Sequence, residues 1–192
     1  HAPFRSLLES SSLLTTAQEL LPVLDFAGDV GASVVTVHAE PPESTSVANA
    51  FPWPMALERL NAKAEENGAV IGLEVTRGFE WIAQLDLPNV GVTLDVGHMY
   101  LDGGRPLRRF GTIDEVVHRI GHALVHLHLH DYDGLHDHIE LGTGQVDLVG
   151  VLKALEEIGY QGGFSLELNP DRVAPEGIRR SLAWLRNLEA LL

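Results

Sequence analysis

Five short runs of β-branched and apolar residues recur along the chain, and a longer stretch with helical periodicity follows each of them. This alternation constrains the fold strongly, because it builds repeated β–α units whose parallel strands are covered by helices. We expect strands at residues 33–38, 69–75, 90–96, 124–130 and 164–168, with a further strand end at 1–4. We expect helices at 16–30, 55–67, 79–85, 113–122, 148–158 and 176–191.

The phase of the side chains favours a closed barrel over an open sheet. Side chains that point to the same face as the ionisable residue at each strand end are small or polar: Gly72 with Glu74, Thr93 with Asp95 and Ser165 with Glu167. Side chains on the opposite face are large and apolar, namely Leu73, Leu94 and Leu166. A confined interior under covering helices requires this arrangement. We predict one domain over residues 1–192, a TIM (β/α) barrel that lacks about two N-terminal βα units. Six units are visible, whereas a complete barrel has eight and typically ~250 residues.

Composition narrows the classes of partner and cofactor. The net charge of −14 disfavours nucleic acid, and the only arginine pairs are 108–109 and 179–180. No apolar run approaches the ~20 residues of a membrane span. The chain has no cysteine, so any metal must bind imidazole and carboxylate groups. We expect a cytoplasmic protein with a small-molecule partner, and self-association into a homo-oligomer is compatible with this composition.

Four ionisable residues end four separate predicted strands: Glu74, Asp95, His128 and Glu167. Carboxylates in phase with core strands are costly to bury unless a cation or another partner compensates them. A network of buried salt bridges is the alternative, but few lysines and arginines lie near these strands. Two carboxylate types with an imidazole suit a divalent ion such as Mn²⁺ or Zn²⁺, with Mg²⁺, Co²⁺ and Fe²⁺ as alternatives.

Several motifs in this order resemble the xylose-isomerase-like barrel superfamily, which contains sugar phosphate isomerases and epimerases and the apurinic-site endonuclease IV group. The strongest lie at 126–131 (HLHLHD), 136–138 (HDH), 141–147 (LGTGQVD), 158–162 (IGYQG) and 165–167 (SLE). A second clear match is 94–98 (LDVGH), and weaker ones are 1–4 (HAPF) and 37–39 (VHA). Together they span nearly the whole chain.

The resemblance implies that Glu74, Asp95, His128 and Glu167 hold a shared metal. In the isomerase and epimerase branch, it implies that Glu74 and Glu167 also exchange the proton of the substrate carbon. His98 would contact substrate oxygens or a second metal. The substrate would be a small sugar, keto-sugar or sugar phosphate.

The endonuclease branch uses a trinuclear zinc cluster, and its additional ligand positions correspond to His1, His38, His98, His136 and His138. His136 departs from that pattern, because the branch has an aspartate there and Asp137 is one residue away. A multinuclear-zinc hydrolase is therefore an alternative function. A non-catalytic barrel that binds a sugar is another.

Other residues carry weaker expectations. His118 and His122 are expected on the surface, and His126 as a hydrogen-bonding residue of the core. Asp131, beside His130 at the rim, would cap a turn or orient a ligand. Gly142 and Gly144 would form a turn into a helix capped by Asp147, with phosphate binding a weaker interpretation. The segment Glu40–Pro54 would be a lid or wall, and Phe51, Trp53 and Trp81 would either line the substrate site or pack in the core.

Overall fold

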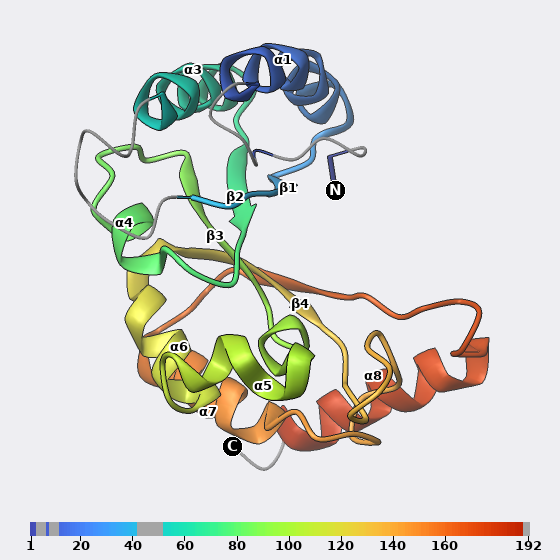
Figure 1. Cartoon of the computed structure of the whole chain (residues 1–192). Helices are drawn as coiled ribbons and strands as arrows, with labels where there is room; N and C mark the ends of the chain where they lie inside the picture. Colours follow the sequence, from blue (N-terminus) through green and yellow to red (C-terminus); the bar gives the residue numbers. More distant parts are fainter. Residues whose placement is uncertain (3–6, 8–11, 42–51, 190–192) are drawn as a thin grey trace. The chain divides into compact units, whose positions relative to one another are not determined.

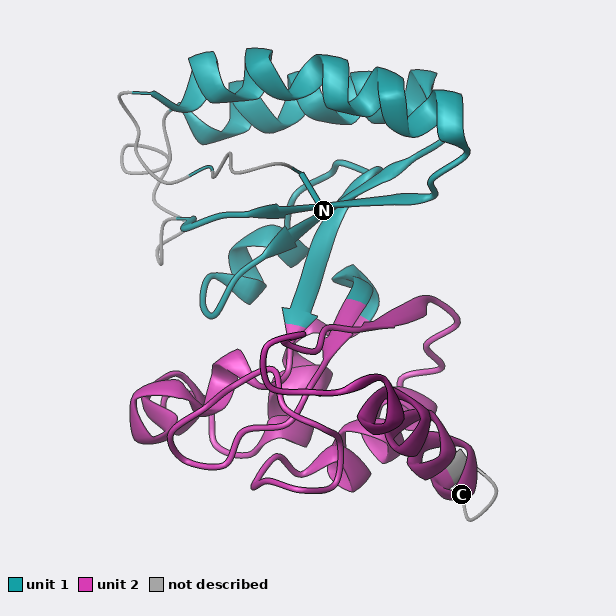
Figure 2. Ribbon diagram, turned by 90° about the vertical axis from the view of Figure 1, so that its right-hand side faces the viewer, with its two compact units in different colours: residues 1–94, 122–126 teal, residues 95–121, 127–192 magenta. Residues whose placement is uncertain are grey.

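The computed structural model describes residues 1–2, 7, 12–41 and 52–189. The chain divides into two compact units (Figure 2). Unit 1 comprises His1–Leu94 and His122–His126, and unit 2 comprises Asp95–Gly121 and Leu127–Leu192. That all of these residues form one barrel domain stays a prediction.

Five strands follow one another in the sheet in the order β1-β2-β3-β4-β5, which is also their order along the chain (Figure 1). They are β1 (Val34–His38), β2 (Val70–Glu74), β3 (Val90–Asp95), β4 (Leu124–Leu129) and β5 (Gly163–Leu166). Each lies within two residues of a predicted strand, as expected of short β-branched runs bounded by turn residues. Strands β3 and β4 begin in unit 1 and end in unit 2.

Unit 1 contains the parallel ladder of the first three strands. Strand β1 pairs with β2 from Val34↔Val70 to His38↔Glu74, and β2 pairs with β3. Helices α1 (Leu13–Val30) and α3 (Trp53–Glu66) pack on each other, and α4 (Phe79–Ala83) follows β2. Their buried faces follow the helical period, including Leu20 and Leu24 on α1.

Close contacts between β1, β2 and β3 confirm the predicted side-chain phase in unit 1. The buried hydroxyls of Thr36 and Thr93 are hydrogen-bonded at 3.1 Å. A Cβ added at Gly72 would lie 2.0 Å from the Thr93 Oγ1, so only glycine fits beside this pair. Small and polar positions therefore share one face of the strands, as a barrel interior requires.

Unit 2 contains the ends of β3 and β4 together with β5 and five helical segments: η1 (His98–Tyr100), α5 (Leu101–Arg108), α6 (Ile113–Ile120), α7 (Leu148–Glu157) and α8 (Pro175–Glu189). The short helix η2 (Gly121–Ala123) leads into β4. Backbone hydrogen bonds join the strand ends, since Val96 donates to the His128 carbonyl and Glu167 donates to the Leu129 carbonyl. Helix α7 begins at the predicted cap, where Asp147 accepts the Gly150 N–H at 2.9 Å.

Helix α5 was not expected, because Asp102, Gly103 and Gly104 adopt positive φ and interrupt it. At the N-terminus, the Ala2 N–H donates to the Thr36 carbonyl, and Leu7 forms a parallel bridge to Ala39; the rest of the predicted 1–4 strand end lies outside the described residues. Most of the predicted lid, residues 42–51 with Phe51, also lies outside them.

Trp53 and Trp81 pack in the core of unit 1. Both are buried, and their ring centroids lie 5.9 Å apart in an edge-to-face arrangement. Edge-to-face pairing is the geometry in which buried aromatic rings stabilise each other. Of the two roles open to them, packing is therefore the one the structure supports.

Candidate metal centre

Asp95 is the last residue of β3 and is buried in unit 2. Its side chain is 2% exposed. The chain turns into η1 directly after it, so the backbone N–H of His98 donates to Asp95 Oδ1 at 2.9 Å. The other oxygen, Oδ2, is buried and accepts no hydrogen bond from the described residues.

His128 and Glu167 converge on the same place in unit 2. His128, the penultimate residue of β4, is buried, and its Nδ1 lies 2.8 Å from Glu167 Oε2. The same nitrogen is 3.9 Å from Asp95 Oδ2. Glu167 follows β5, and its side chain remains 38% exposed. Three residues that the sequence selected at strand ends are thus brought together.

These side chains fit a divalent cation. A buried carboxylate oxygen without a hydrogen bond is costly unless a positive charge compensates it. The side chains that lie beside Asp95 are the imidazoles of His98, His128 and His130. Imidazole and carboxylate groups at these separations are the donors that zinc and manganese accept.

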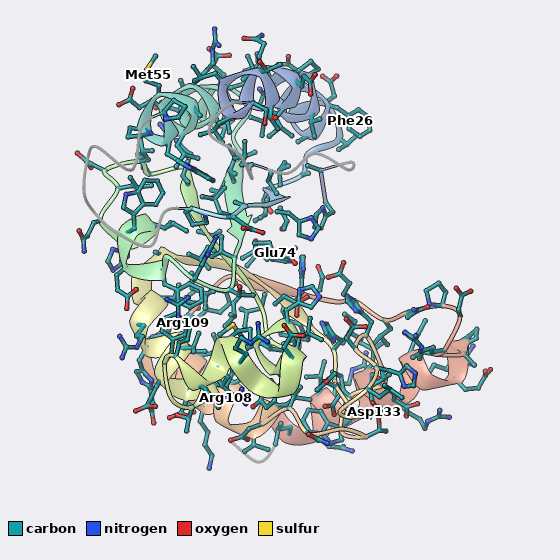
Figure 3. The ribbon with its side chains drawn as sticks, viewed as in Figure 1. Phe26, Met55, Glu74, Arg108, Arg109 and Asp133 are labelled. Carbon is teal, nitrogen blue, oxygen red and sulfur yellow. The ribbon has the colours of Figure 1, made fainter. Side chains whose placement is uncertain are left out.

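Glu74, labelled in Figure 3, lies beside two histidines of unit 1. It ends β2 and is buried, with Oε2 at 3.1 Å from His1 Nε2 and Oε1 at 3.3 Å from His38 Nε2. The His1 and His38 rings lie 4.5 Å apart between centroids. One carboxylate and two imidazoles are thus close enough to bind one ion.

Of the other predicted histidines in unit 2, two lie near Asp95 and one does not. His98 lies 3.5 Å from Asp95 Oδ2, and its ring centroid is 5.3 Å from that of His138. These residues and His130 offer ligand atoms within 4.8 Å of one another. His136 lies elsewhere on the surface, with Nδ1 at 3.3 Å from Asp133 Oδ2, and joins neither cluster within the described ranges.

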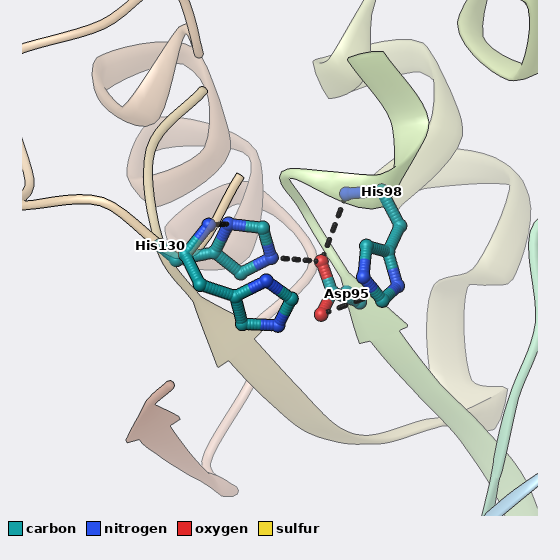
Figure 4. Close-up of side chains that lie close together, drawn as sticks. Asp95, His98 and His130 are labelled. Carbon is teal, nitrogen blue, oxygen red and sulfur yellow. Dashed lines mark hydrogen bonds and ion pairs between the residues drawn. The ribbon is translucent and has the colours of Figure 1, made fainter. Parts of the chain in front are cut away.

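His130 is the residue that reasoning from the sequence missed. It was placed at the rim, but its side chain is 0% exposed and its Nε2 lies 2.7 Å from Asp95 Oδ1 (Figure 4). Burial lowers the pKa of His130, whereas the hydrogen bond and charge of Asp95 raise it, and the net pKa lies above the ordinary value. Its phase was the available signal, because His128 and His130 are two residues apart and share one strand face.

Asp131 holds the loop that follows β4. Its buried carboxylate accepts four backbone N–H groups, from Tyr132, Gly142, Gly144 and Val146, at 2.8–3.0 Å. Its backbone also exchanges two hydrogen bonds with Ile139, the neighbour of His138. The Gly142 and Gly144 N–H groups are therefore occupied by Asp131, which supports the turn-capping role over phosphate binding.

Known proteins resemble this chain over most of its length. A family model for the xylose isomerase-like TIM barrel matches residues 15–188. An uncharacterized protein of Methanocaldococcus jannaschii is 30% identical over 87% of this chain, and a ketose 3-epimerase of Arthrobacter globiformis is 29% identical over 93%. The crystal structure of a xylose isomerase domain protein from Planctomyces limnophilus covers 95% of the chain with a TM-score of 0.76 and 24% identity.

The match to these proteins is partial in length. The chain spans 62% of each of the two curated relatives and 67% of the Planctomyces structure. Its described part contains five strands, whereas a complete barrel has eight. The family model nevertheless covers most of the chain, and this chain belongs to the xylose isomerase-like TIM barrel family.

Proposed function

We propose that this chain acts as a divalent-metal-dependent isomerase or epimerase of a small sugar, keto-sugar or sugar phosphate. The observation that carries the proposal is the approach of Asp95, His128 and Glu167 around a buried carboxylate oxygen that lacks a hydrogen bond. The similarity to a ketose 3-epimerase supports the substrate class.

Glu74, Asp95, His128 and Glu167 would hold the metal. Their donors favour Mn²⁺ or Zn²⁺. When bound, such an ion polarises a substrate carbonyl and hydroxyl, which makes the hydrogen on the neighbouring carbon more acidic. The cluster of Glu74 with His1 and His38 supports a role for unit 1 in this binding.

The two glutamates would move the proton. Glu167 is the more exposed of them, so its carboxylate can meet a substrate while His128 holds one of its oxygens. It would accept the proton from the substrate carbon, and Glu74 would return a proton to the same or the opposite face. His98 is partly exposed beside Asp95 and would donate a hydrogen bond to a substrate oxygen.

The arginines support a small substrate over a nucleic acid. Arg180 forms a two-pronged ion pair with Glu140, Arg179 pairs with Glu176, and Arg108 donates to the Gly103 carbonyl. Arginines engaged in this way offer little to a phosphate backbone, and the net charge of −14 opposes its approach. No helix within the described ranges is both long and apolar enough to cross a membrane.

A second function has support from the additional histidines. The cluster of His1, His38 and Glu74, and the approach of His98 and His138 to Asp95, would suit a multinuclear-zinc hydrolase. In such an enzyme, two or three ions would be expected for each chain. The number of bound ions therefore separates the two functions.

Proton exchange in heavy water tests the proposal directly. We expect the 192-residue chain, loaded with Mn²⁺ or Zn²⁺, to introduce deuterium next to the carbonyl of at least one ketose in a panel. A chelator should stop the exchange, and added metal should restore it. Full activity should require one tightly bound ion per chain. Sugar binding without exchange would indicate the non-catalytic barrel, and phosphodiester cleavage with two or three ions would indicate the hydrolase; either result would contradict the proposal.

A further inference from the structure

We propose that His130 is a positioning residue for the metal centre and not one of its ligands. Its imidazole donates the Nε2–H to Asp95 Oδ1, which would leave Asp95 Oδ2 to bind the ion. This inference rests on the proposed function, because the ion is the one assigned above to Asp95, His128, Glu74 and Glu167. By distance alone, His130 belongs to a group of side chains that could bind a metal. The proposed role excludes it from the ligands.

The hydrogen bonds of His130 determine where its proton lies. The backbone N–H of His138 donates to His130 Nδ1 at 2.9 Å. A backbone N–H can only donate, so Nδ1 must present its lone pair and the ring proton must be on Nε2. The carbonyl oxygen of Asp131 also lies 3.2 Å from His130 Nδ1 and could accept a hydrogen bond from it. A proton on Nδ1 would, however, point at the N–H of His138, and two donors repel each other. Both nitrogens are thus occupied, and neither has a lone pair left for a metal.

The two oxygens of Asp95 are consequently in different environments. Oδ1 accepts two hydrogen bonds, from His130 Nε2 at 2.7 Å and from the His98 backbone at 2.9 Å. Oδ2 accepts none from the described residues, while the Nδ1 atoms of His98 and His128 lie 3.5 and 3.9 Å away. Two donors on one oxygen fix the rotation of the carboxylate and leave the other oxygen available to a cation. Residues that orient a ligand in this way are a general feature of metal sites.

The surroundings of the His130 ring are shaped to hold an imidazole. A Cβ at Gly97 would lie 2.0 Å from His130 Cε1, so the ring occupies the space that a side chain at this position would fill. The His138 ring also stacks on the His130 ring, with centroids 4.0 Å apart and planes at 10°. The sequence Asp95-Val96-Gly97-His98 therefore supplies both the carboxylate and the gap for the residue that orients it.

Substitutions at His130 with different hydrogen-bonding capacity test this role. We expect His130→Phe, which keeps a planar ring but cannot donate, to weaken Zn²⁺ and Mn²⁺ binding roughly 10- to 100-fold, as removal of orienting partners typically does. His130→Gln, which retains an N–H, should recover most of that loss. The exposed His122 serves as the control, since His122→Phe should leave metal affinity unchanged. Affinity is measured by competition with a chelator, and folding by circular dichroism.

Nitrogen-15 NMR of the imidazoles gives a second readout that does not depend on activity. In the metal-free chain, His130 should carry one proton, on Nε2, and that proton should remain when Zn²⁺ is added. The inference is overturned if His130 loses the Nε2 proton to the metal, if its proton lies on Nδ1, or if His130→Phe binds metal as tightly as the unmodified chain. Equal losses in His130→Phe and His130→Gln would also overturn it. A chain that binds metal normally but exchanges no substrate proton would contradict only the proposed function.

Discussion

Replacing Glu167 by glutamine is expected to lower the rate of substrate proton exchange by about 10²- to 10⁴-fold, the usual contribution of a general base. The amide has nearly the same shape as the carboxylate but cannot accept the proton. It can still contact His128, which lies 2.8 Å from Glu167 in the native site. Glu74→Gln should have an effect of the same order, because Glu74 is proposed to return the proton.

The rate of deuterium incorporation from heavy water is measured at a saturating metal concentration. Under this condition, a lower rate reflects the loss of the base and not weaker metal binding. Glu156→Gln, an exposed position on α7, is the matched control and should exchange at the native rate. Native exchange by Glu167→Gln with metal still bound would show that another group moves the proton.

Replacing Asp131 by leucine is expected to reduce the free energy of unfolding by about 3–5 kcal/mol, the range of the most damaging single substitutions. Leucine is similar in size but leaves four backbone N–H groups without their carboxylate partner. Each buried donor left unsatisfied costs about 1–3 kcal/mol. The loop from Ile139 to Val146 should lose its structure first, because these hydrogen bonds hold it.

Urea denaturation measures the effect, and amide hydrogen exchange localises it to that loop. Asp133→Leu is the matched control, because Asp133 also accepts two backbone N–H groups, from Leu135 and His136, but its side chain is exposed to water. Its loss of stability should be much smaller. Equal effects at the two positions would mean that the burial of Asp131 contributes little.

Strand β3 could be predicted from the sequence because burial on both faces requires a continuous apolar, β-branched run. All six residues of β3 are buried, and its limits matched the prediction to one residue. Helix α5 could not be predicted, because two glycines and Pro106 argue against a helix in isolation. Its backbone adopts positive φ at Asp102, Gly103 and Gly104, which helical periodicity does not predict.

The sequence predicted which residues of the candidate site lie at the ends of strands. Asp95 is the last residue of β3 and His128 the penultimate residue of β4, so their proximity follows from the neighbouring positions of these strands in the sheet. The role of His130 could not be predicted from the sequence. It depends on a hydrogen bond from the backbone of His138, which lies eight residues further along the chain in a loop. Contacts that loops make cannot be derived from strand periodicity. The same reasoning applies to Asp131, whose four partners extend to Val146.

A crystal structure of the Zn²⁺- or Mn²⁺-loaded chain, with anomalous scattering measured at the metal edge, tests the central claim most directly. We expect an ion with Glu74, Asp95, His128 and Glu167 as its protein ligands, at about 2.0–2.2 Å for zinc. Asp95 should bind it through Oδ2, with Oδ1 still hydrogen-bonded to His130. An ion bound elsewhere, or these four side chains too far apart to share one ion, would contradict the claim.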